Sequence, residues 1–280
     1  MADLTDEDIF GKMAGRSIVE AYPVRISSIE CEPDPVLEVN HLIAAGVNDV
    51  SFSIRKGEVL GVAALEGQGQ SDLFKTLVGL APLSGGRIHI DGKRIVAKSP
   101  RAARAAGIVL VPEERKSDGL FNDLSTAANI SISVINSVSA FDWIQKGKER
   151  ELVERGAVKV DLQNRYLRPN IEALSGGNQQ KAMLARALLA EPKCLLLFDP
   201  TRGVDVGTKQ NIYKVIREYV QEGGATLLYS TELDELVHLC DRCMVIYRSA
   251  IVAMLEASEL TPELLLALAA GHRTEIHQEK

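Results

Sequence analysis

A serine, two glycines and an asparagine stand together at residues 175–178, directly ahead of a run with helical spacing of apolar residues. A serine at the start of a helix accepts a hydrogen bond from a free backbone N–H group, and glycine lets a ligand approach the main chain closely. The partial positive charge at a helix N-terminus favours an anion in the same place. Ser175, Gly176, Gly177 and Asn178 are therefore candidate anion-binding residues. The simpler alternative is a serine-capped helix that follows a turn.

A second glycine-rich turn lies upstream, between a short apolar strand and a helix. It approximates the pattern G-x-x-x-x-G-K-[ST], in which backbone N–H groups cradle phosphate and the last hydroxyl binds magnesium. Gln70 replaces the lysine, and an amide offers weaker, neutral donors, while Ser71 keeps the hydroxyl. A plain glycine-rich turn is the alternative. The candidate residues of this loop are Ala64, Glu66, Gly67, Gln68, Gly69, Gln70, Ser71 and Asp72.

The elements that must position these turns can be predicted from the apolar pattern. Continuous apolar runs at 59–63, 194–198 and 225–228 predict buried parallel strands, and residues 72–78 predict the helix after the phosphate loop. Ligand-binding residues follow the carboxyl ends of such strands, which makes Asp199 and Asp205 further candidates. Alternating patterns at 36–40, 50–54 and 87–90 predict an antiparallel group, and residues 123–170 and 260–270 are expected to be rich in helix.

Taken together, the run at 174–189, the phosphate loop and the segment at 199–205 resemble the signature, Walker A, and Walker B with D-loop motifs of ATP-binding cassette (ABC) ATPases. The resemblance implies an α/β fold: a P-loop NTPase core of ABC ATPase type, with an antiparallel β subdomain and an inserted α-helical subdomain. ATP and Mg²⁺ are the implied cofactors. In that family residues 175–178 would hold the γ-phosphate of ATP bound by a second cassette, and Asp205 would belong to the D-loop.

Five positions that carry chemistry in this family differ here. Gln70 replaces the phosphate-binding lysine, and Phe198 stands where the magnesium-side aspartate is expected. Asp199 occupies the place of the catalytic glutamate, one methylene shorter, or else it is a strand-end residue that caps a turn. Glu113 takes the Q-loop position and Thr231 the switch-histidine position, or each is a polar residue on a solvated loop; a hydroxyl cannot take up a proton near neutral pH as imidazole does. We expect weak or absent magnesium and doubtful hydrolysis at this chain's own site.

With residues 111–116 and 200–207, these motifs resemble the second, degenerate cassette of fused ATP-binding subunits from bacterial sugar importers. The implied partners are a competent first cassette, in the same longer chain or in a separate subunit, a membrane permease and, indirectly, a periplasmic substrate-binding protein. Residues 1–35 are then expected to be the tail of a preceding cassette plus a linker, and 36–272 the ATPase domain, with its helical subdomain at about 123–190. Residues 273–280 are expected to be a disordered tail. Sugar is favoured as cargo over nucleoside by resemblance alone.

Composition limits the partners. The net charge is −6 and 25% of the residues are charged, which argues against nucleic acid. No apolar run reaches about 18 residues and no signal peptide is visible, so we expect a cytoplasmic chain. It would then lie on the inner face of the plasma membrane through the permease.

Two smaller features have competing interpretations. Cys240 and Cys243 form one C-x-x-C, but one ends an apolar helical run and the other begins a strand, so buried thiols are expected rather than a redox or zinc site. Trp143 and Phe141 are expected to pack in the core, and contact with the permease is the alternative.

Two functions of different classes fit the sequence. One is a cassette that completes a partner's active site, and the other is a non-hydrolytic nucleotide-binding or regulatory module. They differ in whether Ser175 and Gly177 are needed for turnover by the partner.

Overall fold

The computed structural model describes residues 22–23, 35–140 and 143–272. The expected tail and linker at 1–35, apart from Tyr22, Pro23 and Pro35, and the expected disordered tail at 273–280 lie outside the described residues. Phe141 lies outside them too.

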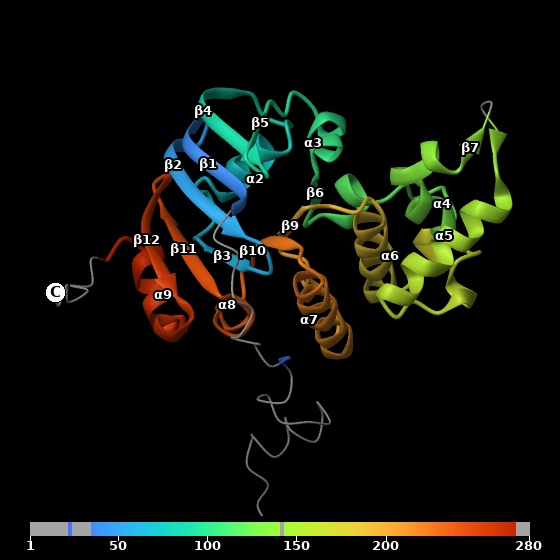
Figure 1. Cartoon of the computed structure of the whole chain (residues 1–280). Coiled ribbons are helices and arrows are strands. Elements are labelled where there is room, and N and C mark those ends of the chain that lie inside the picture. Colours follow the sequence, from blue (N-terminus) through green and yellow to red (C-terminus); the bar gives the residue numbers. More distant parts are fainter. Residues whose placement is uncertain (1–21, 24–34, 141–142, 273–280) are drawn as a thin grey trace, which may run out of the picture.

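A mixed sheet forms the centre of the fold (Figure 1). Within the described residues its strand order is β12-β11-β3-β10-β9-β6, and all of these strands are parallel except β12. Both faces are covered, which explains the continuous apolar runs in the sequence. The strands are β3 (Val59–Ala63), β6 (Ile108–Val111), β9 (Cys194–Phe198), β10 (Ala225–Tyr229), β11 (Arg242–Tyr247) and β12 (Ala250–Glu256).

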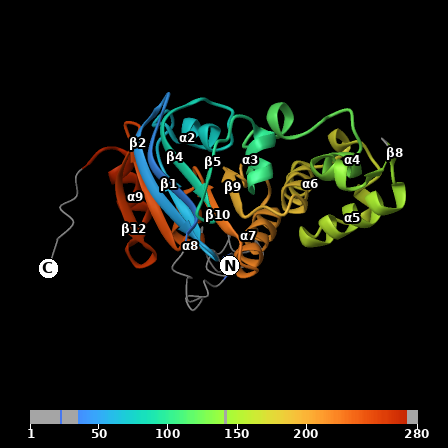
Figure 2. The same ribbon diagram turned by 45° about the horizontal axis from the view of Figure 1, so that its top comes forward.

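A second, antiparallel sheet packs over the central one, as Figure 2 shows from another side. Its order is β2-β1-β4-β5, and alternate residues point into the core, as the alternating pattern predicts. Its strands are β1 (Pro35–Ala44), β2 (Val47–Arg55), β4 (Leu83–Ile90) and β5 (Lys93–Ile95).

The helices cover the central sheet and build a lobe beside it (Figure 1). The lobe contains α4, α5 and α6, which pack on one another. It also carries a small hairpin of β7 (Ser139–Ala140) and β8 (Trp143–Ile144) between its helices. The helices are α2 (Gln70–Leu77), α3 (Pro100–Ala106), α4 (Thr126–Ser131), α5 (Lys146–Lys159), α6 (Gly176–Leu189), α7 (Val206–Gln221), α8 (Leu233–Leu239) and α9 (Pro262–Ala269).

The predicted fold class is confirmed, with local differences. The helix after the phosphate loop begins at Gln70 rather than at residue 72, because Gly69 takes a left-handed conformation (φ 100°) as its N-cap. Trp143 was expected in the core, and this is wrong: its hairpin projects from the lobe, and the residue is 81% exposed. No helix in the described part of the chain is both long and apolar enough to cross a membrane.

Each strand of the central sheet contributes side chains to two hydrophobic cores, one on each face of the sheet. In β9, Leu195 and Leu197 face α6 and α7, whereas Cys194 and Leu196 face α2 and the antiparallel sheet. Phe198, at the end of β9, packs against this second core.

The cysteines among the described residues lie in these cores. Cys194, Cys240 and Cys243 have no exposed surface, and burial raises the pKa of Cys243 to about 12. Because the thiolate is the reactive form, we expect iodoacetamide at about pH 8 to leave these three thiols unmodified in the native chain. After unfolding in guanidinium they should all be alkylated. Mass spectrometry of tryptic peptides measures both states, and rapid native alkylation of Cys243 would contradict the buried-thiol interpretation.

Candidate nucleotide-binding site

The phosphate loop opens onto a cavity of about 670 Å³ at the carboxyl ends of β3, β9 and β10. The structure therefore brings together predicted residues from three distant segments: the loop, the Glu113 segment and the Thr231 segment. Of the predicted site residues, those that line this cavity are Ala64, Glu66, Gly67, Gln70, Ser71, Glu113 and Thr231.

The other residues of the loop face the neighbouring turns. The Gln68 side chain accepts a hydrogen bond from the Arg248 N–H group at 2.6 Å. A Cβ atom at Gly69 would lie 2.1 Å from the carbonyl oxygen of Gly46, and one at Gly46 would lie 2.0 Å from the Asp72 carboxylate. The loop is thus held from outside by the β1–β2 and β11–β12 turns, and the negative charge of Asp72 points toward the first of them.

Aromatic rings surround the position of Phe198, where the resemblance predicts a carboxylate that binds magnesium. Phe198 meets the ring of Phe74 edge-on at 5.0 Å and that of Tyr229 at 4.5 Å. Gln70 is 3% exposed, and its Nε2 reaches the Tyr229 hydroxyl at 3.4 Å, while its Oε1 has no hydrogen-bond partner. A buried neutral amide beside three rings supplies neither a cation for phosphate nor a carboxylate for magnesium. MgATP in its usual mode does not fit these residues.

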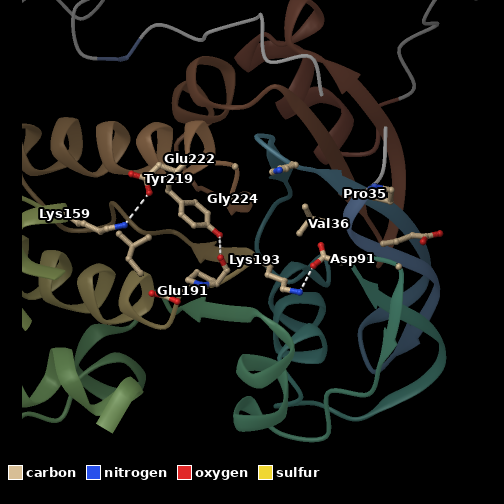
Figure 3. Close-up of a pocket in the computed structure, with 15 residues that line it drawn as sticks. Pro35, Val36, Asp91, Lys159, Glu191, Lys193, Tyr219, Glu222 and Gly224 are labelled. Atoms are coloured by element: carbon tan, nitrogen blue, oxygen red, sulfur yellow. Dashed lines mark hydrogen bonds and ion pairs between the residues drawn. The ribbon is translucent and has the colours of Figure 1, made fainter. Parts of the chain in front are cut away.

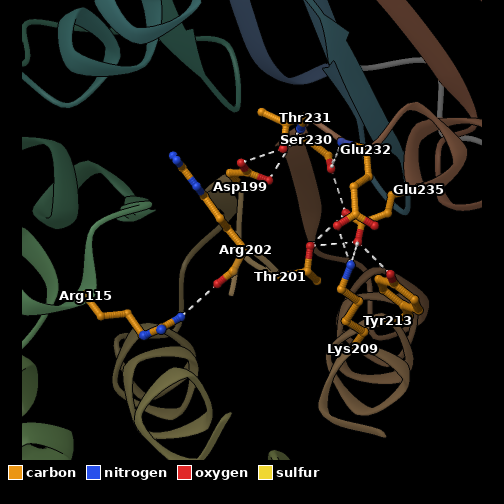
Figure 4. Close-up of polar contacts among 10 residues, drawn as sticks. All are labelled: Arg115, Asp199, Thr201, Arg202, Lys209, Tyr213, Ser230, Thr231, Glu232 and Glu235. Carbon is orange, nitrogen blue, oxygen red and sulfur yellow. Dashed lines mark hydrogen bonds and ion pairs between the residues drawn. The ribbon is translucent and has the colours of Figure 1, made fainter. Parts of the chain in front are cut away.

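Asp199 is engaged within the chain. It lies at the end of β9 with a left-handed backbone (φ 49°) and is 3% exposed. Its carboxylate accepts hydrogen bonds from the Thr231 hydroxyl at 2.9 Å and from the Thr231 N–H group at 3.4 Å (Figure 4). Burial raises the pKa of Asp199. The two residues predicted to act on water and γ-phosphate thus bond to each other.

Glu113 also has an internal partner. It forms an ion pair with Arg202, whose carbonyl oxygen accepts a hydrogen bond from Nη1 of Arg115 at 2.9 Å. Figure 4 shows Arg115 reaching toward Arg202 between the start of α6 and the end of β9. The two arginines therefore connect the segment after β6 with the segment after β9.

The glycine-rich turn at the start of α6 has the geometry of a capped helix N-terminus. The Ser175 side chain is exposed and accepts hydrogen bonds from the Asn178 N–H group at 3.4 Å and from Asn178 Nδ2 at 3.1 Å. Gly176, the first residue of the helix, is partly exposed, and a Cβ atom there would lie 3.2 Å from Arg115 Nη2. An anion at this turn would meet backbone dipoles and a nearby guanidinium.

Gly177 is buried rather than open to solvent. A Cβ atom there would lie 2.4 Å from the Thr208 hydroxyl oxygen and 3.2 Å from the Asp205 carboxylate. Asp205 in turn caps α7, since it accepts hydrogen bonds from the Thr208 N–H group at 3.0 Å and from the Thr208 hydroxyl at 2.8 Å. These bonds lower the pKa of Asp205. The two candidate turns are therefore packed against each other.

Comparison with known proteins agrees with this geometry. The model of the ABC transporter family matches residues 47–202, more than half of the chain. The chain belongs to the ABC transporter family.

The curated proteins that this chain resembles include several import ATP-binding proteins. The ribose import ATP-binding proteins of Ruegeria sp. and Halalkalibacterium halodurans are each 38% identical to it, over 273 and 279 residues, which is 97% and 99% of this chain. A putative ribose/galactose/methyl galactoside import ATP-binding protein of Pseudomonas syringae is 38% identical over 97% of the chain. The matches cover 53%, 55% and 52% of those proteins, so this ABC chain spans about half the length of these relatives.

Solved structures show the fold of the same family. A nucleotide-free ATP-binding cassette from an ABC transporter has a TM-score of 0.71 with 24% identity, over 83% of this chain and 95% of that one. Another ABC transporter cassette has a TM-score of 0.73 with 22% identity, over 84% and 97%.

Another large cavity of the ABC domain lies at the opposite ends of the parallel strands (Figure 3). It measures about 870 Å³ and is bordered by Pro35, Lys193 and Glu222 among others. Lys159 pairs with Glu222 at 3.4 Å, and Lys193 pairs with Asp91 at 2.5 Å. Because these charges satisfy one another, this cavity is a weaker candidate site than the one at the phosphate loop.

Sequence reasoning missed several residues that the structure places in or beside the site. Arg202 and Arg115 stand inside the motifs that were recognised, yet only the folded chain shows that they meet. Glu235 was also missed, since a glutamate in an amphipathic helix carries no signal of burial. It has no exposed surface and binds hydroxyl groups from both neighbouring loops.

Proposed function

We propose that this chain is an ATP-binding cassette of a sugar importer that works through its signature turn rather than through its own phosphate loop. In this proposal the turn at 175–178 completes the active site of a competent cassette, together with the D-loop around Asp205. ATP hydrolysis then belongs to the assembled transporter.

The observation that carries the proposal is the contrast between the two turns. The phosphate loop carries a buried amide at Gln70 in place of a lysine and opens onto the rings of Phe198 and Tyr229, and the carboxylate of Asp199 is bonded to Thr231. The signature turn keeps an exposed capping serine and the N-terminus of a helix that spans Gly176–Leu189. The first arrangement disfavours MgATP, and the second favours a phosphate group.

The partners follow from the relatives. Three relatives are named as import ATP-binding proteins for ribose or related sugars, which supports sugar as the cargo. Their length, about twice that of the matched region, supports the placement of this chain as one half of a fused protein. The altered residues of the phosphate loop favour the second half, with 1–35 as tail and linker and 36–272 as the ATPase domain. A periplasmic substrate-binding protein would act through the permease, and the chain would lie on the cytoplasmic face of the membrane.

A groove beside the site is suited to a permease segment. It measures about 760 Å³ between α2, α3 and the residues after β6, and combines Leu80, which is 59% exposed, with Glu114 and Asp118. An apolar floor with a charged rim is typical of a protein-binding groove. In this proposal, contact between the exposed Trp143 and the permease remains a prediction.

The proposal is tested on the purified chain. We expect MgATP to bind more weakly than about 1 mM by isothermal titration, with no phosphate release above the level of a buffer blank. The missing lysine charge and magnesium ligand are the reason. Micromolar affinity with steady turnover would contradict the proposal. High affinity without turnover would instead favour the second candidate, a non-hydrolytic nucleotide sensor.

A further inference from the structure

A buried carboxylate links the two loops that border the signature side of the domain. Glu235 of α8 has no exposed surface, and its oxygens accept hydrogen bonds from the Thr201 hydroxyl at 2.7 and 2.8 Å and from the Ser230 hydroxyl at 2.7 Å. Thr201 begins the segment that leads to Asp205, and Ser230 directly precedes Thr231. Figure 4 shows the Thr201 and Ser230 side chains both reaching Glu235. One side chain therefore holds both loops.

A third donor comes from α7. The Tyr213 hydroxyl donates to Glu235 at 2.6 Å, and Tyr213 is 3% exposed. Lys209, one turn earlier, lies 3.8 Å from Glu235 and forms a closer ion pair with Glu232. The Glu235 carboxylate thus accepts hydrogen bonds from three hydroxyl groups, and the nearby ammonium group of Lys209 is shared with Glu232. A buried carboxylate of this kind depends on each donor staying in place.

Tyr22, from the part of the sequence before β1, covers the outer side of this cluster. Its ring stacks on Tyr213 with centroids 5.0 Å apart and an interplanar angle of 18°. It also stacks on His238 of α8 at 4.3 Å and 10°. Tyr22 is half-buried, and burial together with the charge of Glu235 raises its pKa to about 12. A residue that precedes the domain, and that is far from Tyr213 in sequence, therefore packs on the tyrosine that bonds Glu235.

We propose that Tyr22 is a positioning residue that, by stacking on Tyr213 and His238, holds the Glu235 cluster and so fixes the loops at Thr201 and Ser230. Tyr22 is thereby attached to the two loops that flank Asp205 and Thr231. The attachment involves only residues of this chain and needs neither a partner cassette nor nucleotide. If the proposed function holds, the attachment also keeps the D-loop around Asp205 in place for the partner cassette. This effect on turnover rests on the proposed function.

The physical reason is the exclusion of water from the Tyr213 ring. Aromatic stacking fixes ring orientation, and a fixed ring keeps the Tyr213 hydroxyl aimed at Glu235. If Tyr22 is removed, water gains access to Tyr213 and can compete for the carboxylate. Thr201 and Ser230 then lose a rigid acceptor, and their loops open more often.

Hydrogen exchange on the full chain tests this attachment. Tyr22→Ala is expected to raise the exchange rates of amides in residues 200–208 and 229–235 by about tenfold or more, while rates in β3 and β9 stay within about twofold. Tyr22→Phe keeps the stack and loses only the contact of its hydroxyl with Tyr213, so its exchange rates should stay within about threefold of those of the unaltered chain. Tyr213→Phe keeps the stack but removes the donor, and should reproduce the effect of Tyr22→Ala in both segments.

Tyr166→Ala is the matched control, because it removes another half-buried tyrosine ring that lies in the helical lobe. It should leave both loop segments unchanged. Unaltered exchange in residues 200–208 and 229–235 of Tyr22→Ala would overturn the proposal, as would an equal effect of Tyr166→Ala. Since this measurement needs neither nucleotide nor partner, its failure is distinct from a failure of the proposed function.

Discussion

Replacing Ser175 by arginine is expected to reduce the ATPase rate of the assembled transporter by about 100-fold or more. The long side chain would fill the space in front of the α6 N-terminus, where the proposed γ-phosphate of the partner's ATP lies. The substitution also removes the helix cap, which costs about 1 kcal/mol of folding stability. Phosphate release by transporter in membranes or nanodiscs measures the rate.

The control for this prediction is Ser125→Arg. Ser125 also caps a helix of the lobe, since it accepts a hydrogen bond from the Ala128 N–H group at 3.2 Å. Both variants lose one cap, so similar shifts in melting temperature are expected, but only Ser175→Arg should stop turnover. Gly177→Asp is a less specific test, because a side chain there would collide with Thr208 inside the same chain. Normal turnover in Ser175→Arg would refute the role of the signature turn.

Restoring charge to the phosphate loop is expected to raise its affinity for MgATP. The double variant Gln70→Lys with Phe198→Asp puts a cation at the phosphate position and a carboxylate at the magnesium position. Each charged hydrogen bond contributes on the order of 1.5–3 kcal/mol, so a gain of at least roughly tenfold is expected. Hydrolysis should stay slow, because Asp199 remains bonded to Thr231 and Glu113 to Arg202. Titration calorimetry and phosphate release on one preparation separate binding from chemistry.

A matched variant separates charge from the loss of the ring. Gln70→Lys with Phe198→Asn removes the same aromatic contacts and differs from the double variant by one charge. It should gain less affinity, and its gain should not depend on magnesium. Each lost aromatic pair costs about 0.5–1.5 kcal/mol, so both variants need a check of folding by circular dichroism. Equal affinities in the two variants would show that the magnesium position has not been rebuilt.

Local features of this chain could be predicted from its sequence. The buried strands at 59–63 and 194–198 and the cap at Ser175 were predictable, because apolar runs and capping serines are local signals. Trp143 was placed wrongly, since composition cannot distinguish a core tryptophan from one at the tip of an exposed hairpin.

Contacts between segments that are distant in sequence could not be predicted from local patterns. The bonds of Asp199 to Thr231 and the packing of Gly177 on Thr208 join segments that are separate in sequence. Neither residue type indicates its partner, since an aspartate after a strand fits a catalytic role and a capping role equally well. The family to which the motifs belong could be predicted from the sequence, but the groups that bond to their residues within the folded chain could not.

The aromatic contacts of Phe198 also bear on how such a site evolves. The ring at the magnesium position packs against the core beneath the antiparallel sheet, alongside Phe74 and Tyr229. A single substitution of Phe198 by aspartate would place a carboxylate among these rings with no lysine at position 70. Under the proposed function, the aspartate variant without the lysine is expected to be less stable than this chain, because an unpaired carboxylate would lie among the rings. If the proposed function holds, regaining hydrolysis at this phosphate loop would need at least the substitutions at Gln70 and Phe198 together, because either one alone leaves its new charge without a partner.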